Sequence, residues 1–212
     1  MTMSSADDEG PLSPAESLAL ISDERAKVDR SLSPSRALLF GLWGATWLTG
    51  WTLMFLATPS GPELLPLWLA GAVFAAAVVG SIALSIVVGV RASRGIAGQS
   101  RLSGALYGWT WTLGFWALTA INVGFTVKLG VSIEVTALLW TTGPLLIMGL
   151  LTMLGAAQRR SVPEYGAGVW LLLAASASVY VGVPANLLVL GLAGGGALLG
   201  LAVHFAREAR SA

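Results

Sequence analysis

The chain contains no cysteine and a single histidine, His204. The absence of cysteine excludes disulfide bonds, thiol catalysis, iron–sulfur clusters and thiolate metal sites. One histidine alone excludes haem ligation by two histidines and any histidine-rich metal centre. We therefore expect neither a cofactor nor a bound metal.

Sequence patterns that indicate catalysis are also missing. The chain has no phosphate-binding loop of the Gly-x-x-x-x-Gly-Lys-Ser/Thr type, no Gly-x-Ser-x-Gly and no His-Glu-x-x-His. We therefore expect that the protein is not an enzyme. Any ATP-driven activity would need a separate ATPase subunit.

Charge is scarce. Only 11% of the residues are charged and 55% are hydrophobic, whereas soluble domains carry roughly 25% charged residues. The mean hydropathy is +0.76. So little polar surface cannot cover a water-soluble domain, and the expected solvent is the lipid bilayer. A net charge of +1 provides no basic face for nucleic acid, and no such partner is expected.

Long apolar runs are what the chain does have. A span needs about 20 residues to cross about 30 Å of hydrocarbon. Six runs qualify, of which the fifth is the shortest; they cover residues 37–57, 67–90, 104–127, 135–157, 167–181 and 187–205. The sequence therefore predicts an all-α integral membrane protein. In it, residues 35–206 form six transmembrane helices, arranged as three helical hairpins.

Basic residues predict the orientation. If the N-terminus is inside, all 12 basic residues except Lys128 lie on the cytoplasmic side of the membrane. That distribution follows the positive-inside rule. We expect both termini in the cytoplasm, with residues 207–212 as a cytoplasmic tail, and the protein in the plasma membrane. The excess of arginine over lysine, with abundant Ala and Gly, is typical of a GC-rich bacterial genome.

The segment before the first span has its own pattern. Residues 1–12 are acidic and predicted to be disordered, and residues 13–34 are predicted to form a cytoplasmic amphipathic helix and a linker. The helix begins with a capping box, in which Ser13 and Glu16 satisfy free backbone N–H groups. Its apolar stripe consists of Leu18, Ile21, Val28 and Leu32. A second Leu-Ser-Pro at residues 32–34 is predicted to cap a new helix, the first span.

Charges are missing from the middle of every predicted span. A central charge costs roughly 2.5–3.5 kcal/mol and persists mainly where function requires it. Because proton- or sodium-driven carriers usually keep such a residue, an autonomous ion-coupled exporter is not expected. The glutamates at the ends of spans are expected to be solvated; they are Glu63, Glu134, Glu164 and Glu208.

Tryptophans are spaced so that they form faces on two predicted spans. Trp43, Trp47 and Trp51 are four residues apart, and a similar pair lies seven apart on the third span. One hypothesis is a ligand pocket for an apolar or cationic molecule, formed by Trp47, Trp51, Trp109, Trp116 and Asn122. The competing and more common interpretation is that the rings fill gaps between helices. Asn122 would then hydrogen-bond to a neighbouring helix.

Small residues recur at helical intervals on the first and last spans: Gly41, Ala45, Thr49, Gly191, Gly195, Gly196 and Gly200. Such faces let helix backbones approach closely in lipid. They predict helix–helix interfaces, either within the chain or with another membrane subunit, including a second copy in a homo-oligomer.

Gly143 and Pro144 are predicted to kink the fourth span, because proline removes one helix hydrogen bond. Thr141 and Thr142 are predicted to bond the carbonyl groups that the proline leaves free.

Two functions fit these features. The first is a permease-type or substrate-capturing subunit of a multi-component transporter that lacks its own energy-coupling site. In outline the chain resembles the substrate-capture components of vitamin transporters, by architecture alone. The alternative is a membrane-embedded regulatory, sensor or scaffold protein that docks partners through its N-terminal cytoplasmic helix.

Overall fold

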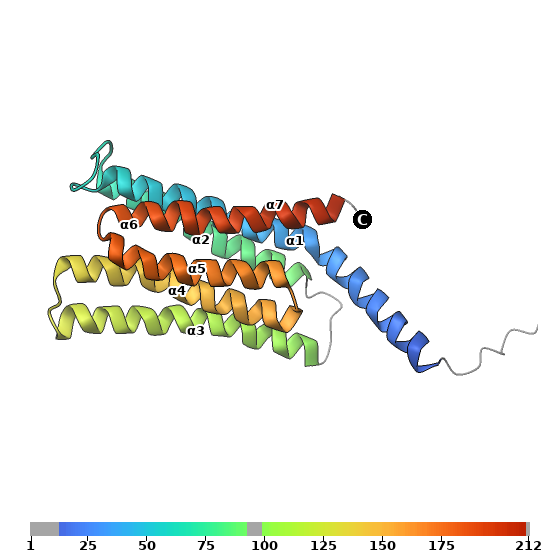
Figure 1. Ribbon diagram of the computed structural model, residues 1–212. Coiled ribbons are helices and arrows are strands. Elements are labelled where there is room, and N and C mark those ends of the chain that lie inside the picture. Colours follow the sequence, from blue (N-terminus) through green and yellow to red (C-terminus); the bar gives the residue numbers. More distant parts are fainter. Residues whose placement is uncertain (1–12, 93–98, 211–212) are drawn as a thin grey trace, which may run out of the picture.

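The computed structural model describes residues 13–92 and 99–210, and these residues form helices without a strand (Figure 1). The predicted disordered segment 1–12 and the last two residues of the predicted tail lie outside the described residues. The elements in chain order are α1 (Pro14–Ala57), α2 (Leu67–Ala92), α3 (Gln99–Lys128), α4 (Ile133–Arg159), α5 (Val162–Val181), α6 (Ala185–Leu188), η1 (Val189–Gly195) and α7 (Gly196–Arg210). The predicted all-α class is confirmed.

Five helices are long and apolar enough to cross a membrane: Ser35–Ala57, Leu67–Arg91, Ile133–Arg159, Val162–Val181 and Ala185–Arg210. Large apolar side chains cover their outer surfaces; examples are Trp68, Val79 and Leu173, each more than half exposed. Water solvates such a continuous apolar surface poorly, whereas lipid tails solvate it well. The chain is a multi-pass membrane protein.

α3 is not one of the five. It has 30 residues and no charge between Arg101 and Lys128, but it carries several Trp and Thr residues and Asn122. These residues make it less apolar than the other helices. The predicted sixth span therefore stays a prediction.

α1 is a single helix of 44 residues, so the predicted linker and second helix start at residues 32–34 are wrong. The sequence has no glycine between Pro14 and Gly41 that would end the helix, and an internal proline weakens a helix by one hydrogen bond without necessarily stopping it. At 1.5 Å per residue, the 21 residues before Ser35 extend about 30 Å. Figure 1 shows this N-terminal part projecting beyond the other helices, at the end of the bundle where the C-terminus lies.

Two glycine contacts bring helix backbones together. A Cβ on Gly195 would lie 2.9 Å from the carbonyl oxygen of Gly44, and a Cβ on Gly44 would lie 2.8 Å from the backbone nitrogen of Leu199. A second pair joins α4 to α5, where a Cβ on Gly168 would lie 2.9 Å from the carbonyl oxygen of Gly149. In lipid, such close approach replaces the hydrophobic driving force. These contacts hold α1 against the last helix and α4 against α5.

α2 and α3 lie at the periphery. Among the described residues, α2 packs on α1 and α3 packs on α4, each without contact to another helix. Polar side chains hold α2: Thr46 and Ser81 hydroxyls lie 2.8 Å apart, and Trp43 Nε1 donates to Ser85 Oγ at 3.0 Å. On α3, Tyr107 donates to the Leu151 carbonyl at 2.8 Å. Such hydrogen bonds help to hold the helices together, because the hydrocarbon of the bilayer contains no water that would compete for the donors and acceptors.

α4 continues through Pro144. Thr142 donates to the Leu138 carbonyl at 2.7 Å, and Thr141 bonds the carbonyls of residues 137 and 138. The carbonyl that Pro144 leaves free belongs to Trp140, four residues earlier, so the predicted compensation is wrong. Gly143 makes room for α3, since a Cβ there would lie 2.6 Å from Leu118 Cδ1. The kink itself stays a prediction.

The last helix contains a π-helical stretch, η1, that periodicity did not predict. η1 is rich in glycine and runs between α6 and α7 without a break. Trp170 Nε1 on α5 donates to the Ala193 carbonyl at 3.1 Å. An outside donor therefore satisfies one of the carbonyls of this wider turn.

Replacing Gly195 with Ala should destabilise the protein by about 1–3 kcal/mol. The new Cβ would lie 2.6 Å from the backbone nitrogen of Leu48, and backbone cannot move aside cheaply. Gly196→Ala is the matched control, because it has no neighbour within 4 Å. Thermal unfolding in detergent measures both. Equal unfolding temperatures for the two variants would contradict the close contact between Gly195 and α1.

The start of α1 should fray in acid. Ser13 N donates to the Glu16 carboxylate at 2.8 Å, and Glu16 N donates to Ser13 Oγ at 3.2 Å. The backbone hydrogen bond, and next the side-chain one, lower the pKa of Glu16 from its ordinary 4.5. The cap therefore stabilises the helix fully above pH 4.5 and is lost as pH falls through the lowered pKa. Amide exchange of residues 14–17 should speed up in that range, and Glu16→Gln should remove the pH dependence.

Candidate functional site

The predicted tryptophan pocket is not assembled. Trp47 and Trp51 are 4% and 9% exposed and pack edge to face within the core, with ring centroids 6.0 Å apart. Trp109 and Trp116 are 61% and 72% exposed and point away from the core. Packing accounts for the first pair, and the second pair lies on the outer surface of α3.

Asn122, the remaining member of that predicted pocket, is buried. Its Nδ2 donates to the Leu139 carbonyl at 3.3 Å and joins α3 to α4. The interhelical role, which was the competing interpretation, is the one observed.

The predicted small-residue faces divide into two groups. A Cβ on Gly41 would lie 3.5 Å from Ala202 Cβ, and Gly191 and Gly195 pack against α1. These three glycines serve contacts within the chain. The others are exposed, and their docking against another subunit stays a prediction; they are Ala45, Thr49, Gly196 and Gly200.

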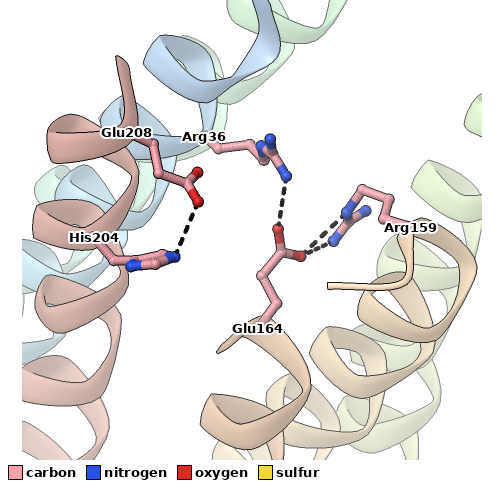
Figure 2. A network of polar contacts seen from close by, with 5 residues as sticks. All are labelled: Arg36, Arg159, Glu164, His204 and Glu208. Carbon is pink, nitrogen blue, oxygen red and sulfur yellow. Dashed lines mark hydrogen bonds and ion pairs between the residues drawn. The ribbon is translucent and has the colours of Figure 1, made fainter. Parts of the chain in front are cut away.

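The most unusual polar residue is Glu164, in the first turn of α5. The prediction that it is a solvated end residue is wrong, because its side chain is 0% exposed. Arg36 Nη1 lies 3.5 Å from its Oε1, and Arg159 Nε donates to its Oε2 at 3.1 Å. Arg159 Nη2 bonds the same oxygen. Figure 2 shows the carboxylate between the two guanidinium groups. One buried charge therefore joins α1, α4 and α5.

Arg36 also ties this network to α7. Its guanidinium carbon lies 4.5 Å from the centre of the Phe205 ring, and Phe40 stacks on Phe205 with centroids 5.8 Å apart. On α7, His204 Nε2 lies 3.4 Å from Glu208 Oε1. The base of the projecting part of α1 is thus held by ionic, cation–π and aromatic contacts at once.

The turn between α4 and α5 explains how Glu164 comes to lie here. α4 ends at Arg159 and is capped by Arg160, which adopts the left-handed conformation with φ 56°, and α5 begins after Ser161. So short a turn places the first residues of α5 beside Arg159, at the end of α4. The N-terminus of α5 also favours a carboxylate through the helix dipole.

A signal in the sequence would have drawn attention to Glu164. Ser161 and Glu164 have the same spacing as the capping box of Ser13 and Glu16. In α1 the pattern forms a capping box, whereas Ser161 makes no side-chain cap bond and Glu164 turns to the arginines instead. A capping pattern next to two arginines is the signal that sequence reasoning missed.

A cavity of about 320 Å³ lies beside this network. Its lining combines three arginines with one carboxylate and a few polar and apolar side chains: Arg36, Arg159, Arg160, Ser161, Val162, Pro163, His204, Phe205 and Glu208. With three arginines at its edge, the cavity is suited to an anion rather than to a metal ion. Among the described residues, no group of three or more His, Asp or Glu is placed to hold a metal.

Comparison with models of protein families, with curated proteins and with solved structures gives no match to this chain. Proposals about its function therefore rest on its own residues.

Replacing Glu164 with Gln should destabilise the bundle, because two guanidinium groups lose the charge that compensates them. We expect a loss of about 2–3 kcal/mol, below the value for a fully buried pair, since the Arg159 side chain is 36% exposed. Glu134→Gln, exposed in the first turn of α4, should cost less than about 1 kcal/mol. Denaturant titration in micelles measures both. A Glu164→Gln protein as stable as the control would refute the structural role of the network.

Proposed function

We propose that the protein crosses the plasma membrane six times, with α3 as the remaining span, and that its arginine-rich end faces the cytoplasm. This end carries Arg36, Arg91, Arg159, Arg160, Arg207 and Arg210. The positive-inside rule supports this orientation. The uncharged stretch of α3 between residues 102 and 127 supports the sixth span. Both termini then lie in the cytoplasm.

We propose further that the protein is a regulatory or scaffold subunit that docks a cytoplasmic partner on the projecting part of α1. The observation that carries this proposal is that α1 continues as one helix well beyond the bundle. Leu18, Leu20 and Ile21 on this part are each about half exposed or more. Exposed apolar side chains on a capped helix are typical of a segment that buries them in a partner's groove.

The charge of this segment favours a protein partner over the membrane surface. Residues 14–34 carry four acidic residues and three basic ones, so the segment has no excess of positive charge. Helices that lie on anionic lipid are usually basic on their polar face. The partner that fits is a soluble domain with an apolar groove.

The network at the base of α1 supports the same reading. Arg36 lies at the start of the span and is fixed by Glu164 and Phe205. A helix that is continuous and fixed at its base transmits the position of a bound partner to the bundle. A flexible tether would not transmit it.

A transporter subunit is the second candidate, and one observation favours it. Asn186 is buried in the bundle, where its Nδ2 donates to Thr141 Oγ1 at 2.8 Å and its Oδ1 has no hydrogen-bond partner in the described residues. An unused acceptor in a membrane core is a candidate ligand contact. The projecting part of α1, called the arm below, supports the docking function more strongly than Asn186 supports a transporter. The reason is that the tryptophan pocket predicted for a transported ligand is not formed.

Deleting residues 1–31 should abolish capture of cytoplasmic partners while membrane insertion stays intact, because the spans are untouched. Affinity purification with quantitative mass spectrometry measures the capture. Partners that remain bound after the deletion would exclude the arm as the docking site and leave the transporter subunit as the better candidate.

A point variant sharpens this test. Ile21→Glu places a charge on the predicted apolar stripe, and binding should weaken at least tenfold, or by about 1.4 kcal/mol. Ala19→Glu adds the same charge on another side of the helix and should bind as the wild type does. Equal loss in both variants would mean that net charge, not an apolar contact, governs binding.

A further inference from the structure

We propose that the cavity at the arginine-rich end binds a phosphate group, either the headgroup phosphate of a membrane phospholipid or a soluble phosphate ester. This site is separate from the docking surface of α1. The proposal rests on the charge at the cavity, on the backbone at Arg160 and on the position of the cavity at the ends of the spans.

The groups around the cavity leave an excess of positive charge. Arg36, Arg159 and Arg160 carry three positive charges, against the carboxylates of Glu164 and Glu208. Glu164 is fully buried, so it neutralises the inner sides of two guanidinium groups without filling the cavity. An anion in the cavity would compensate the remaining charge.

Arg159 is oriented for such an anion. Its Nε and Nη2 donate to Glu164, and its guanidinium carbon lies 5.9 Å from the centre of the Tyr107 ring. In the described part of the chain, Nη1 makes no hydrogen bond. Guanidinium groups bind phosphate oxygens through paired N–H donors, and here a carboxylate and an aromatic ring fix the orientation of the plane.

Arg160 gives an independent argument. It occupies the left-handed region with φ 56° at the C-terminal cap of α4, a position that glycine usually fills. A residue with a side chain is strained there, because its Cβ lies too close to the following carbonyl oxygen. No carboxylate of the described residues lies within ion-pair distance of its guanidinium. A strained arginine therefore lines the cationic cavity, and no described carboxylate pairs with it.

The position of the cavity fits a headgroup. It lies where α4 ends and α5 begins, at the boundary of the apolar spans. Val162 in its wall is exposed and supplies the apolar surface there. A phosphate at that depth would meet the arginines while the glycerol and upper acyl carbons meet the apolar wall.

The test uses the full-length protein in a neutral detergent. Its melting temperature is measured with inorganic phosphate and with chloride at equal ionic strength. The retention of phosphatidylglycerol against phosphatidylcholine is measured separately by native mass spectrometry. We expect phosphate to raise the melting temperature by several degrees, or phosphatidylglycerol to be retained selectively. A response to phosphate alone assigns a soluble ligand, and retention of the lipid alone assigns the headgroup.

Arg160→Gly is the decisive variant, because glycine relieves the strained backbone and removes the charge. We expect it to melt no lower than the wild type without ligand and to bind at least tenfold more weakly. Arg91→Gln removes one charge from the same end of the bundle, away from the cavity, and should bind as the wild type does. The proposal would be overturned if the wild type bound neither phosphate nor phosphatidylglycerol, or if Arg160→Gly bound them as tightly as the wild type does. Neither result depends on the docking function of α1.

Discussion

Hydrocarbon offers no hydrogen bonds, and this constraint accounts for how the helices are held. Polar side chains inside the bundle pair with neighbours on adjacent helices: Thr46 with Ser81, and Asn122 with the Leu139 carbonyl. Because lipid tails are as apolar as the helices, association depends on close packing. The glycine contact between Gly44 and Gly195 supplies it for α1 and the last helix. The stable core is thus the set of α1, α4, α5 and α7, with α2 and α3 added at its edges.

The buried charge at Glu164 follows the same constraint at the boundary of the membrane. A carboxylate can be removed from water only where opposite charges and donors replace its hydration. Arg36 and Arg159 do so from two other helices. This requirement fixes the base of the long helix α1 relative to the α4–α5 turn. The proposed arm and the proposed phosphate site therefore both depend on the ion pairs of Glu164, although each is tested independently.

Sequence periodicity predicted the helices because each span is a long apolar run, and the start of α1 because Ser13 and Glu16 form a local motif. It did not separate Glu16 from Glu164, which have the same spacing from a serine, because one of the two arginines that bind Glu164, Arg36, comes from a distant part of the chain. Trp47 and Trp109 look alike in sequence, yet one is buried and the other exposed. Which face of a helix turns inward depends on neighbours, and in lipid both faces are apolar. The contact between Arg36 and Glu164 therefore could not be predicted from the sequence, whereas the long apolar helices could.

The direct test of the membrane arrangement uses the absence of cysteine. Three single-cysteine variants place a reporter near the start of α3, at the N-cap of α4 and in the turn after α4; they are Ser103→Cys, Ser132→Cys and Ser161→Cys. In intact cells, a membrane-impermeant maleimide should label only the cysteine at position 132. The other two should react only after the membrane is opened. Labelling of position 161 from outside would reverse the orientation, and equal labelling of positions 103 and 132 would show that α3 does not cross the bilayer.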